Sequence, residues 1–93
     1  MIKILIIEDD LYVLEMLREV LLSMGVEPRC FNSPKLALEV IQREKFDGVT
    51  LDIMMPEVDG IQLTGAIREC RLNKKTPVVG ISGSEDRRQW KRS

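Results

Sequence analysis

The fold is decided by the stretch from Phe46 to Gly60, which reads FDGVTLDIMMPEVDG. Its first half is short, apolar and β-branched, which favours a strand buried on both faces of a sheet. Asp52 ends that run, where a carboxylate is costly unless a cation or hydrogen-bond donors compensate it. Pro56 then stops the strand, and Asp59 with Gly60 is typical of a turn into a helix. Two interpretations of Asp52 are open here: a loop cap, or the chemical centre that open α/β sheets place at the carboxyl end of a central strand.

Size and composition limit the classes of protein to consider. A chain of 93 residues predicts one domain, residues 1–93. The net charge of −1 argues against binding to nucleic acid or a membrane surface, and no apolar run approaches the ~20 residues of a membrane span. Cys30 and Cys70 make neither a disulfide framework nor a zinc site, so we expect reduced packing residues in a cytoplasmic protein. The absence of histidine excludes histidine-based catalysis and metal binding.

Hydrophobic periodicity along the chain alternates between the strand type and the helix type. Gly25 reads as a helix stop, Pro28 assigns its strand to a sheet edge, and Ser33 with Pro34 is a good helix start. The expected strands are 2–7, 26–31, 46–52 and 78–82; the expected helices are 11–24, 34–44 and 60–72, followed by a last short helical segment, 85–93.

This βαβαβαβ order predicts an α/β domain with a parallel sheet and helices on both faces. The polar ends of three strands then converge at one rim of the sheet: Glu8 with Asp9, Asp52, and Ser82. Asp10 is expected to cap the following helix, which leaves Glu8 and Asp9 without an obvious structural role. Solvated loop acids are the weaker alternative for these two.

Clustered carboxylates repel one another, and a divalent cation removes that cost. Because every expected ligand is an oxygen, the pattern indicates a hard ion, Mg²⁺ or Mn²⁺ as a substitute, rather than zinc. An aspartate beside such an ion can attack a phosphoryl group and form an acyl phosphate. Ser82 can donate a hydrogen bond to that group, although a strand-end hydroxyl bonded to backbone is the simpler reading of this residue alone.

Three blocks of sequence resemble the receiver domain of bacterial response regulators: ILIIEDD at 4–10, LDIMMPEVDG at 51–60 and TPVVGIS at 76–82. The resemblance implies a flavodoxin-like fold with strand order 2-1-3-4. It implies that a sensor histidine kinase phosphorylates Asp52, that Glu8, Asp9, Asp52 and the backbone carbonyl of Met54 hold Mg²⁺, and that Ser82 is the switch hydroxyl that binds the phosphoryl group.

The chain departs from this family pattern near its end. The family has a fifth strand and a fifth helix, which this sequence lacks, and the family's phosphoryl-binding lysine has no match here because Lys91 lies on the wrong element. An open fourth-strand edge invites association. We therefore expect a homo-oligomer, formed through that edge or by exchange of elements.

Three functions compete on this evidence. The leading one is a phosphoacceptor signalling module, which is not a turnover enzyme. The alternative is a phosphorylation-impaired receiver-like interaction module, because the family lysine is missing. A Mg²⁺-dependent phosphatase would need an acid where Met54 stands. The basic patch around Trp90 is either a partner-binding face or a frayed terminus, and a nucleic-acid role is not expected for it.

Overall fold

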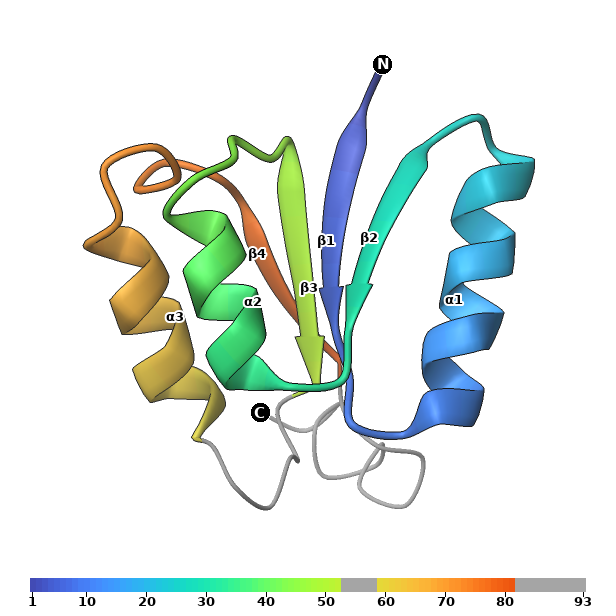
Figure 1. Ribbon diagram of the computed structural model, residues 1–93, viewed down its shortest axis with the longest axis horizontal. Helices are drawn as coiled ribbons and strands as arrows, with labels where there is room; N and C mark the ends of the chain where they lie inside the picture. The colour runs from blue at the N-terminus through green and yellow to red at the C-terminus, as the bar shows by residue number, and fades with distance from the viewer. Residues whose placement is uncertain (53–58, 82–93) are drawn as a thin grey trace, which may run out of the picture.

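The computed structural model describes residues 1–52 and 59–81, which form a parallel sheet with helices packed on it (Figure 1). The strand order is β2-β1-β3-β4, and every pairing is parallel. The strands are β1 (Lys3–Ile7), β2 (Glu27–Phe31), β3 (Gly48–Asp52) and β4 (Val78–Ile81); the helices are α1 (Leu11–Ser23), α2 (Pro34–Ile41) and α3 (Gly60–Arg68). The predicted α/β fold and strand order are confirmed.

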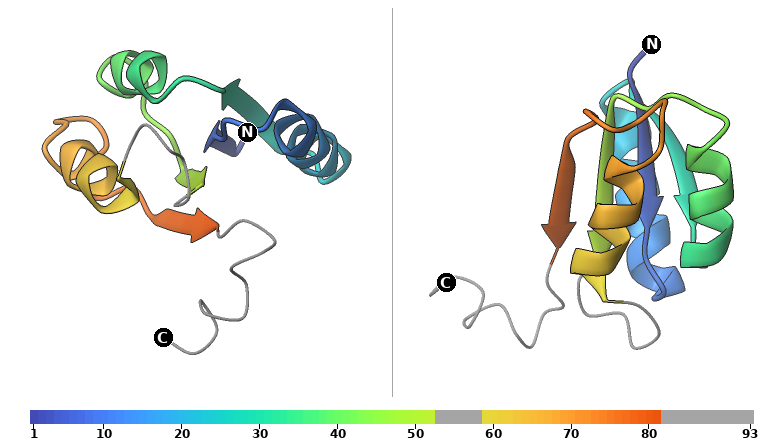
Figure 2. Two further views of the ribbon diagram at one scale, coloured as in Figure 1. Left: turned by 90° about the horizontal axis from the view of Figure 1, so that it is seen from below. Right: turned by 90° about the vertical axis from the view of Figure 1, so that its left-hand side faces the viewer.

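The two faces of the sheet are covered differently (Figure 2). Helices α2 and α3 lie on one face, where they enclose the main core, and α1 lies on the other face beside β1 and β2. The core cluster combines sheet residues Leu5, Ile7, Val49 and Leu51 with Ala37, Ile41, Phe46, Leu63, Ile67 and Cys70. Because side chains alternate along a strand, Ile6 and Thr50 point to the α1 face.

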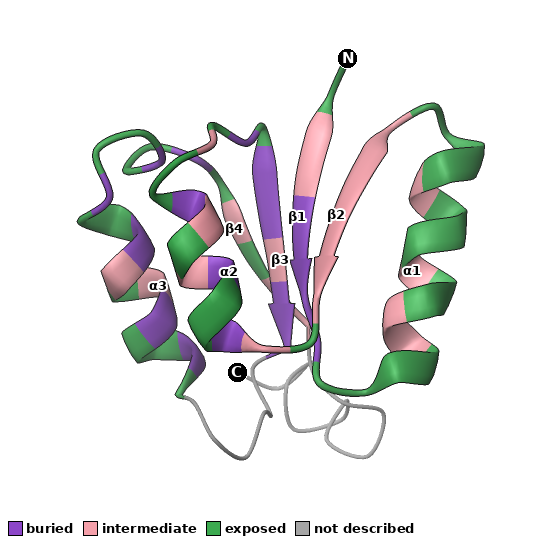
Figure 3. Ribbon diagram, in the orientation of Figure 1, coloured by how far each residue is buried: buried purple, intermediate pink, exposed green. Residues whose placement is uncertain are grey.

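Helix α1 is the least covered element of the described fold (Figure 3). None of its residues is buried, although its apolar residues recur at the spacing expected for a packed face. Val20 is 48% exposed, and Met24, just beyond the helix, is 67% exposed. Only part of the predicted apolar face of α1 therefore packs against the sheet. The reason is geometric: α1 contacts β1 and β2, and no other described helix lies on that face of the sheet.

Local signals place the helix starts correctly. The side chain of Asp10 accepts hydrogen bonds from backbone amides of α1, Ser33 caps α2 and Asp59 caps α3. Gly25 follows α1 with φ of +77°, a conformation that suits glycine and ends the helix. The Pro28 strand is an edge strand, as predicted. No helix in the described part of the chain has the length and apolar character needed to cross a bilayer.

Helices α2 and α3 both end earlier than the sequence predicts. Helix α2 stops at Ile41 rather than near Glu44, and α3 stops at Arg68 rather than near Leu72. After Arg68 the chain continues in tight turns, in which the amides of residues 69, 70 and 73 donate to carbonyls three residues back. Such turns satisfy the last carbonyls without extending the helix.

A single asparagine fastens the amino end of the sheet, where β3 and β4 begin. The fully buried Asn73 donates from Nδ2 to the carbonyls of Ile41 (2.6 Å) and Glu44 (2.7 Å). Its Oδ1 accepts from the Phe46 amide (2.9 Å) and from the Thr76 hydroxyl (2.9 Å). Asn73 therefore closes the end of α2 and ties the α2–β3 connection to the α3–β4 connection.

Candidate functional site

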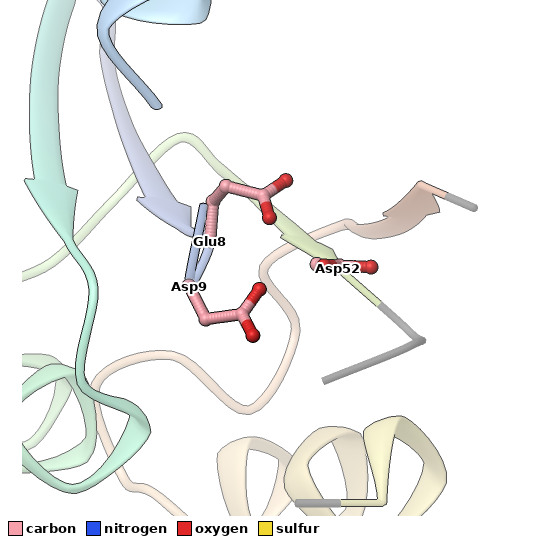
Figure 4. Close-up of side chains that lie close together, drawn as sticks. All are labelled: Glu8, Asp9 and Asp52. Carbon is pink, nitrogen blue, oxygen red and sulfur yellow. The ribbon is translucent and has the colours of Figure 1, made fainter. Parts of the chain in front are cut away.

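Three acidic side chains meet at the carboxyl end of the sheet (Figure 4). Glu8 and Asp9 directly follow β1, and Asp52 is the last residue of β3, the strand beside it. One carboxylate oxygen from each of the three lies within 4.8 Å of the others. Glu8 is 6% exposed and Asp52 is 9% exposed, whereas Asp9 is open to solvent. The predicted convergence of these acids is confirmed.

The backbone explains why two neighbouring acids have such different surroundings. The amide of Glu8 donates to the carbonyl of Phe31 (3.0 Å), which extends the hydrogen bonding between β1 and β2 by one residue and keeps Glu8 inside the sheet edge. The chain then turns, and the amide of Asp10 donates to Oε2 of Glu8 (3.2 Å). Oδ1 of Asp10 accepts from the amides of Tyr12 (2.9 Å) and Val13 (3.3 Å). Asp10 is thus the cap, as predicted, and not a member of the cluster.

Burial makes the negative charge on Glu8 expensive. Desolvation, followed by a shared hydrogen bond with Asp52 and repulsion from that carboxylate, raises the pKa of Glu8 from 4.5 to about 7. The Asp10 amide acts in the opposite direction but does not compensate. Neither Glu8 nor Asp9 forms an ion pair with a lysine or arginine in the described part of the chain. Among residues 1–52 and 59–81, no basic side chain therefore compensates the charge of these two acids.

The donor set fits a hard divalent cation. All three groups offer carboxylate oxygens, which suit Mg²⁺ or Mn²⁺, and no nitrogen or sulfur ligand stands among them. A cation at this position would also favour the ionised form of Glu8 and oppose the effect of burial. Without such a cation, the buried negative charge of Glu8 is a cost to the fold.

Two of the predicted site residues lie outside the described residues. Ser82, expected as the phosphoryl-binding hydroxyl, and Met54, expected to offer a backbone carbonyl, both belong to this group. The last predicted segment, 85–93, falls outside as well. Ile81, which precedes Ser82, pairs with Asp52 in the sheet.

The structure also contains a hollow near the carboxyl end of the sheet that the sequence does not predict. A hollow of about 430 Å³ lies between β3, β4 and the first turn of α3, with Leu51, Val78 and Ile61 among its apolar lining. Gly80 lies on the same side of β4 as Val78 and has no side chain to fill this space. A glycine inside an apolar strand was the available signal for it.

Comparisons with known proteins agree with this architecture. Residues 4–93 match the family described as the response regulator receiver domain. The response regulator protein TodT of Pseudomonas putida is 34% identical over 83 residues, which cover 89% of this chain and 36% of TodT. This chain therefore spans about a third of the length of that relative.

Solved structures give the same fold. The chemotaxis response regulator CheY4 of Vibrio cholerae matches with a TM-score of 0.83 at 24% identity, covering 97% of this chain and 76% of CheY4. The receiver domain of the sensor histidine kinase PA1611 from Pseudomonas aeruginosa PAO1 matches with a TM-score of 0.81 at 22% identity, covering 92% and 73%, and that structure has a magnesium ion coordinated in its active site cleft. At these identities the likeness concerns the fold alone. With the family match over residues 4–93, the chain belongs to the response regulator receiver domain family.

Proposed function

We propose that this chain is a phosphoacceptor module of a bacterial two-component signalling system and that Asp52 accepts the phosphoryl group from a histidine kinase. The observation that carries the proposal is the position of Asp52. It ends a central strand and is nine-tenths buried, and one of its carboxylate oxygens lies within 4.8 Å of those of Glu8 and Asp9. A carboxylate kept in such surroundings is costly for stability, so a chemical role explains it better than a structural one.

Each residue has a defined part in the proposed transfer. A carboxylate oxygen of Asp52 attacks phosphorus, the phosphorus–nitrogen bond of the donor phosphohistidine breaks, and the electron pair leaves with the imidazole. Glu8, Asp9 and Asp52 are the groups that would hold Mg²⁺, with the backbone carbonyl of Met54. When bound, the ion supplies positive charge against the oxygens of the transferring group. Ser82 is proposed to donate a hydrogen bond to the acylphosphate product.

The remaining family expectations stand as parts of the same proposal. The chain accepts and loses a phosphoryl group rather than turning over a separate substrate, so it is not proposed as an enzyme. Its donor would be a sensor histidine kinase, and its place would be the cytoplasm. The magnesium-bound receiver domain of PA1611 supports the choice of Mg²⁺ for the acidic cluster, since that domain shares the fold.

The direct test incubates the chain with Mg²⁺ and acetyl phosphate and then measures its intact mass. We expect a gain of one phosphoryl group, located by peptide mapping on Asp52 and lost in Asp52→Asn. The matched control is Asp47→Asn. Asp47 directly precedes β3, at the end of that strand opposite to Asp52, and its Oδ2 accepts a hydrogen bond from the amide of Lys3 (2.8 Å). An asparagine oxygen preserves that acceptor, so Asp47→Asn should label normally.

Two results would contradict the proposal. A label that persists in Asp52→Asn would place the acceptor elsewhere. A wild-type chain that binds Mg²⁺ through the acidic cluster but takes up neither a phosphoryl group nor beryllofluoride would instead identify a phosphorylation-impaired interaction module. Loss of Mg²⁺ binding in Asp9→Asn, with the fold intact by circular dichroism, would show that the cluster is the metal site in either case.

A further inference from the structure

Two connections lie side by side at the amino end of the sheet (Figure 1): residues 42–47 join α2 to β3, and residues 69–77 join α3 to β4. Buried hydrogen bonds hold them together. Asn73 of the second connection accepts from the amide of Phe46 in the first (2.9 Å), and the hydroxyl of Thr76 donates to the carbonyl of Phe46 (3.2 Å). The two connections therefore form one surface on a fixed backbone.

The exposed side chains of this surface are mainly basic. Two come from the first connection and three from the second: Arg43, Lys45, Arg71, Lys74 and Lys75. We call these five residues the amino-end basic surface. They outnumber the exposed acids of the same connections, which are Asp47 and Glu69. Glu44, the remaining acid, is partly buried, and its carboxylate already contacts Arg29 and Lys3.

The charge of the amino-end basic surface is not neutralised by the described residues. None of its five side chains forms an ion pair within residues 1–52 and 59–81. Arg68, at the end of α3, supports the surface from below: its Nη1 donates to the carbonyls of Thr76 (2.7 Å) and Lys74 (3.3 Å). Arg68 thereby holds the turn that presents Lys74 and Lys75, and a turn held in place loses less entropy when a partner binds.

We propose that the amino-end basic surface binds an acidic segment of a partner protein. The carboxylates of that segment pair with the five basic side chains, and Arg43 and Arg71 can each hold a carboxylate through two parallel hydrogen bonds. Leu72, which is 39% exposed beside Arg71, offers a contact for an apolar residue of the same segment. The proposal does not rest on phosphoryl transfer, because the acidic cluster lies at the opposite end of the strands.

The charge distribution of the chain favours a short partner over an extended polyanion. Duplex DNA carries one phosphate charge about every 1.7 Å along its axis, and an anionic membrane extends beyond a surface of this size. Either would also meet acids outside the basic surface, because the chain as a whole carries a net charge of −1. A short acidic segment can contact the basic surface alone, so charge complementarity is best satisfied by a protein partner.

The test measures binding of the full chain to a short fluorescein-labelled peptide by fluorescence anisotropy. The peptide contains glutamate, aspartate and serine around one central leucine, and its matched control replaces every acid by the corresponding amide. We expect binding of the acidic peptide that weakens as salt increases, and no binding of the amide peptide. Replacing the central leucine by serine should weaken binding without changing its salt dependence, because that contact is apolar.

Single charge reversals locate the binding surface on the chain. Arg43→Glu and Lys74→Glu, one in each connection, should each weaken the affinity by about threefold or more, and together by at least about tenfold. Lys35→Glu is the matched control, an equal change in charge at an exposed position on the first turn of α2, and should bind like wild type. Because all three side chains are exposed, the variants should keep the circular dichroism spectrum of wild type.

Three results would overturn the proposal. The first is an acidic peptide that does not bind at high micromolar concentration, or binds no better than the amide peptide. The second is an affinity that the combined Arg43→Glu and Lys74→Glu substitutions leave unchanged. The third is tighter binding to duplex DNA or to vesicles of anionic lipid than to the acidic peptide, lost in the same double variant, which would assign the surface to a different class of partner.

Discussion

The two ends of this sheet solve the problem of buried polar groups in opposite ways. At the amino end, Asn73 is fully buried and both of its polar atoms are hydrogen-bonded to connections that lead into β3 and β4. At the carboxyl end, Glu8 and Asp52 are almost as deeply buried, and there burial together with the neighbouring Asp52 makes the negative charge of Glu8 unfavourable. Buried polar groups thus stabilise the amino end of the sheet and destabilise the carboxyl end. We place the proposed phosphoryl transfer at the carboxyl end.

The largest effect on stability should come from removing the hydrogen bonds of Asn73 at the amino end of the sheet. Asn73→Ala leaves the amide of Phe46 and the carbonyls of Ile41 and Glu44 buried without their partner. Unsatisfied buried groups of this kind cost about 1–3 kcal/mol each, so we expect the free energy of unfolding to fall by about 3 kcal/mol or more. Urea unfolding followed by circular dichroism measures this change.

Asn32→Ala is the matched control for that variant, because Asn32 is exposed in the loop before α2. Its effect should stay within about 0.5 kcal/mol. Asn73→Asp keeps the shape but replaces the Nδ2 donor by an oxygen that faces two carbonyls, so it tests the loss of the donor together with the introduction of a buried carboxyl group. If Asn73→Ala unfolds at the same urea concentration as wild type, the hydrogen bonds of Asn73 do not stabilise the amino end of the sheet.

The next largest effect concerns pH at the acidic cluster. Burial raises the pKa of Glu8 to about 7, above its unfolded value of 4.5. The folded chain therefore binds more protons than the unfolded chain between these values, and without metal its stability should fall as pH rises from about 4.5 to 7. The shift corresponds to at most roughly 3 kcal/mol. Unfolding by urea at pH 5, 6, 7 and 8, with a chelator present, checks the slope.

Glu8→Gln should flatten that pH dependence, whereas Glu39→Gln, at an exposed position on α2, should leave it unchanged. Added Mg²⁺ should raise stability most at pH 8, where Glu8 is ionised, and least at pH 5. A stability that rises with pH over this interval in the absence of metal would contradict the claim that ionised Glu8 destabilises the carboxyl end of the sheet.

The sequence predicts the acidic cluster better than it predicts what surrounds it. Parallel strands place their carboxyl ends at one edge, so Glu8, Asp9 and Asp52 had to meet once the βαβ order was recognised. Asn73 follows the predicted helix 60–72 in a polar segment, and an asparagine there gives no sign that it closes the end of a helix 32 residues away. That role depends on tertiary packing, which local pattern does not encode.

The same distinction explains the helix boundaries. The predicted helices 34–44 and 60–72 extend past Ile41 and past Arg68, so they are longer than the helices of the structure. Helix α2 ends where Asn73 donates to the carbonyl of its last residue, Ile41, and α3 ends where the chain turns back to begin β4. By contrast, the starts of the helices follow from Asp10, Ser33 and Asp59, whose capping is a local interaction.

A smaller effect should separate Asp10 from the acids that precede it. Because Asp10 caps α1 through two backbone amides, Asp10→Ala should destabilise the chain by about 1 kcal/mol. Asp10→Asn keeps an equivalent cap and should be nearly neutral for stability. Thermal unfolding measures both, and Mg²⁺ titration should show that Asp10→Asn binds the ion like wild type. Weakened Mg²⁺ binding in Asp10→Asn would assign Asp10 to the cluster instead.

The smallest effect concerns a second glutamate, Glu44, at the fastened end. Arg29 (2.6 Å) and then Lys3 (3.3 Å) contact its Oε1 and lower its pKa, in contrast to Glu8. Its stabilising contribution should therefore be present above the unfolded pKa of 4.5 and be lost as pH falls through the lower folded value, the opposite sign to Glu8. Because the side chain is 31% exposed, solvent screens the pair, and Glu44→Gln should cost only about 0.5–1 kcal/mol at pH 7. Urea unfolding of Glu44→Gln at low and at high salt measures this cost, which should shrink as salt is added, whereas the four hydrogen bonds of Asn73 should hold at both salt concentrations. A Glu44→Gln variant as damaging as Asn73→Ala would mean that charge, rather than the satisfied asparagine, secures the amino end of the sheet.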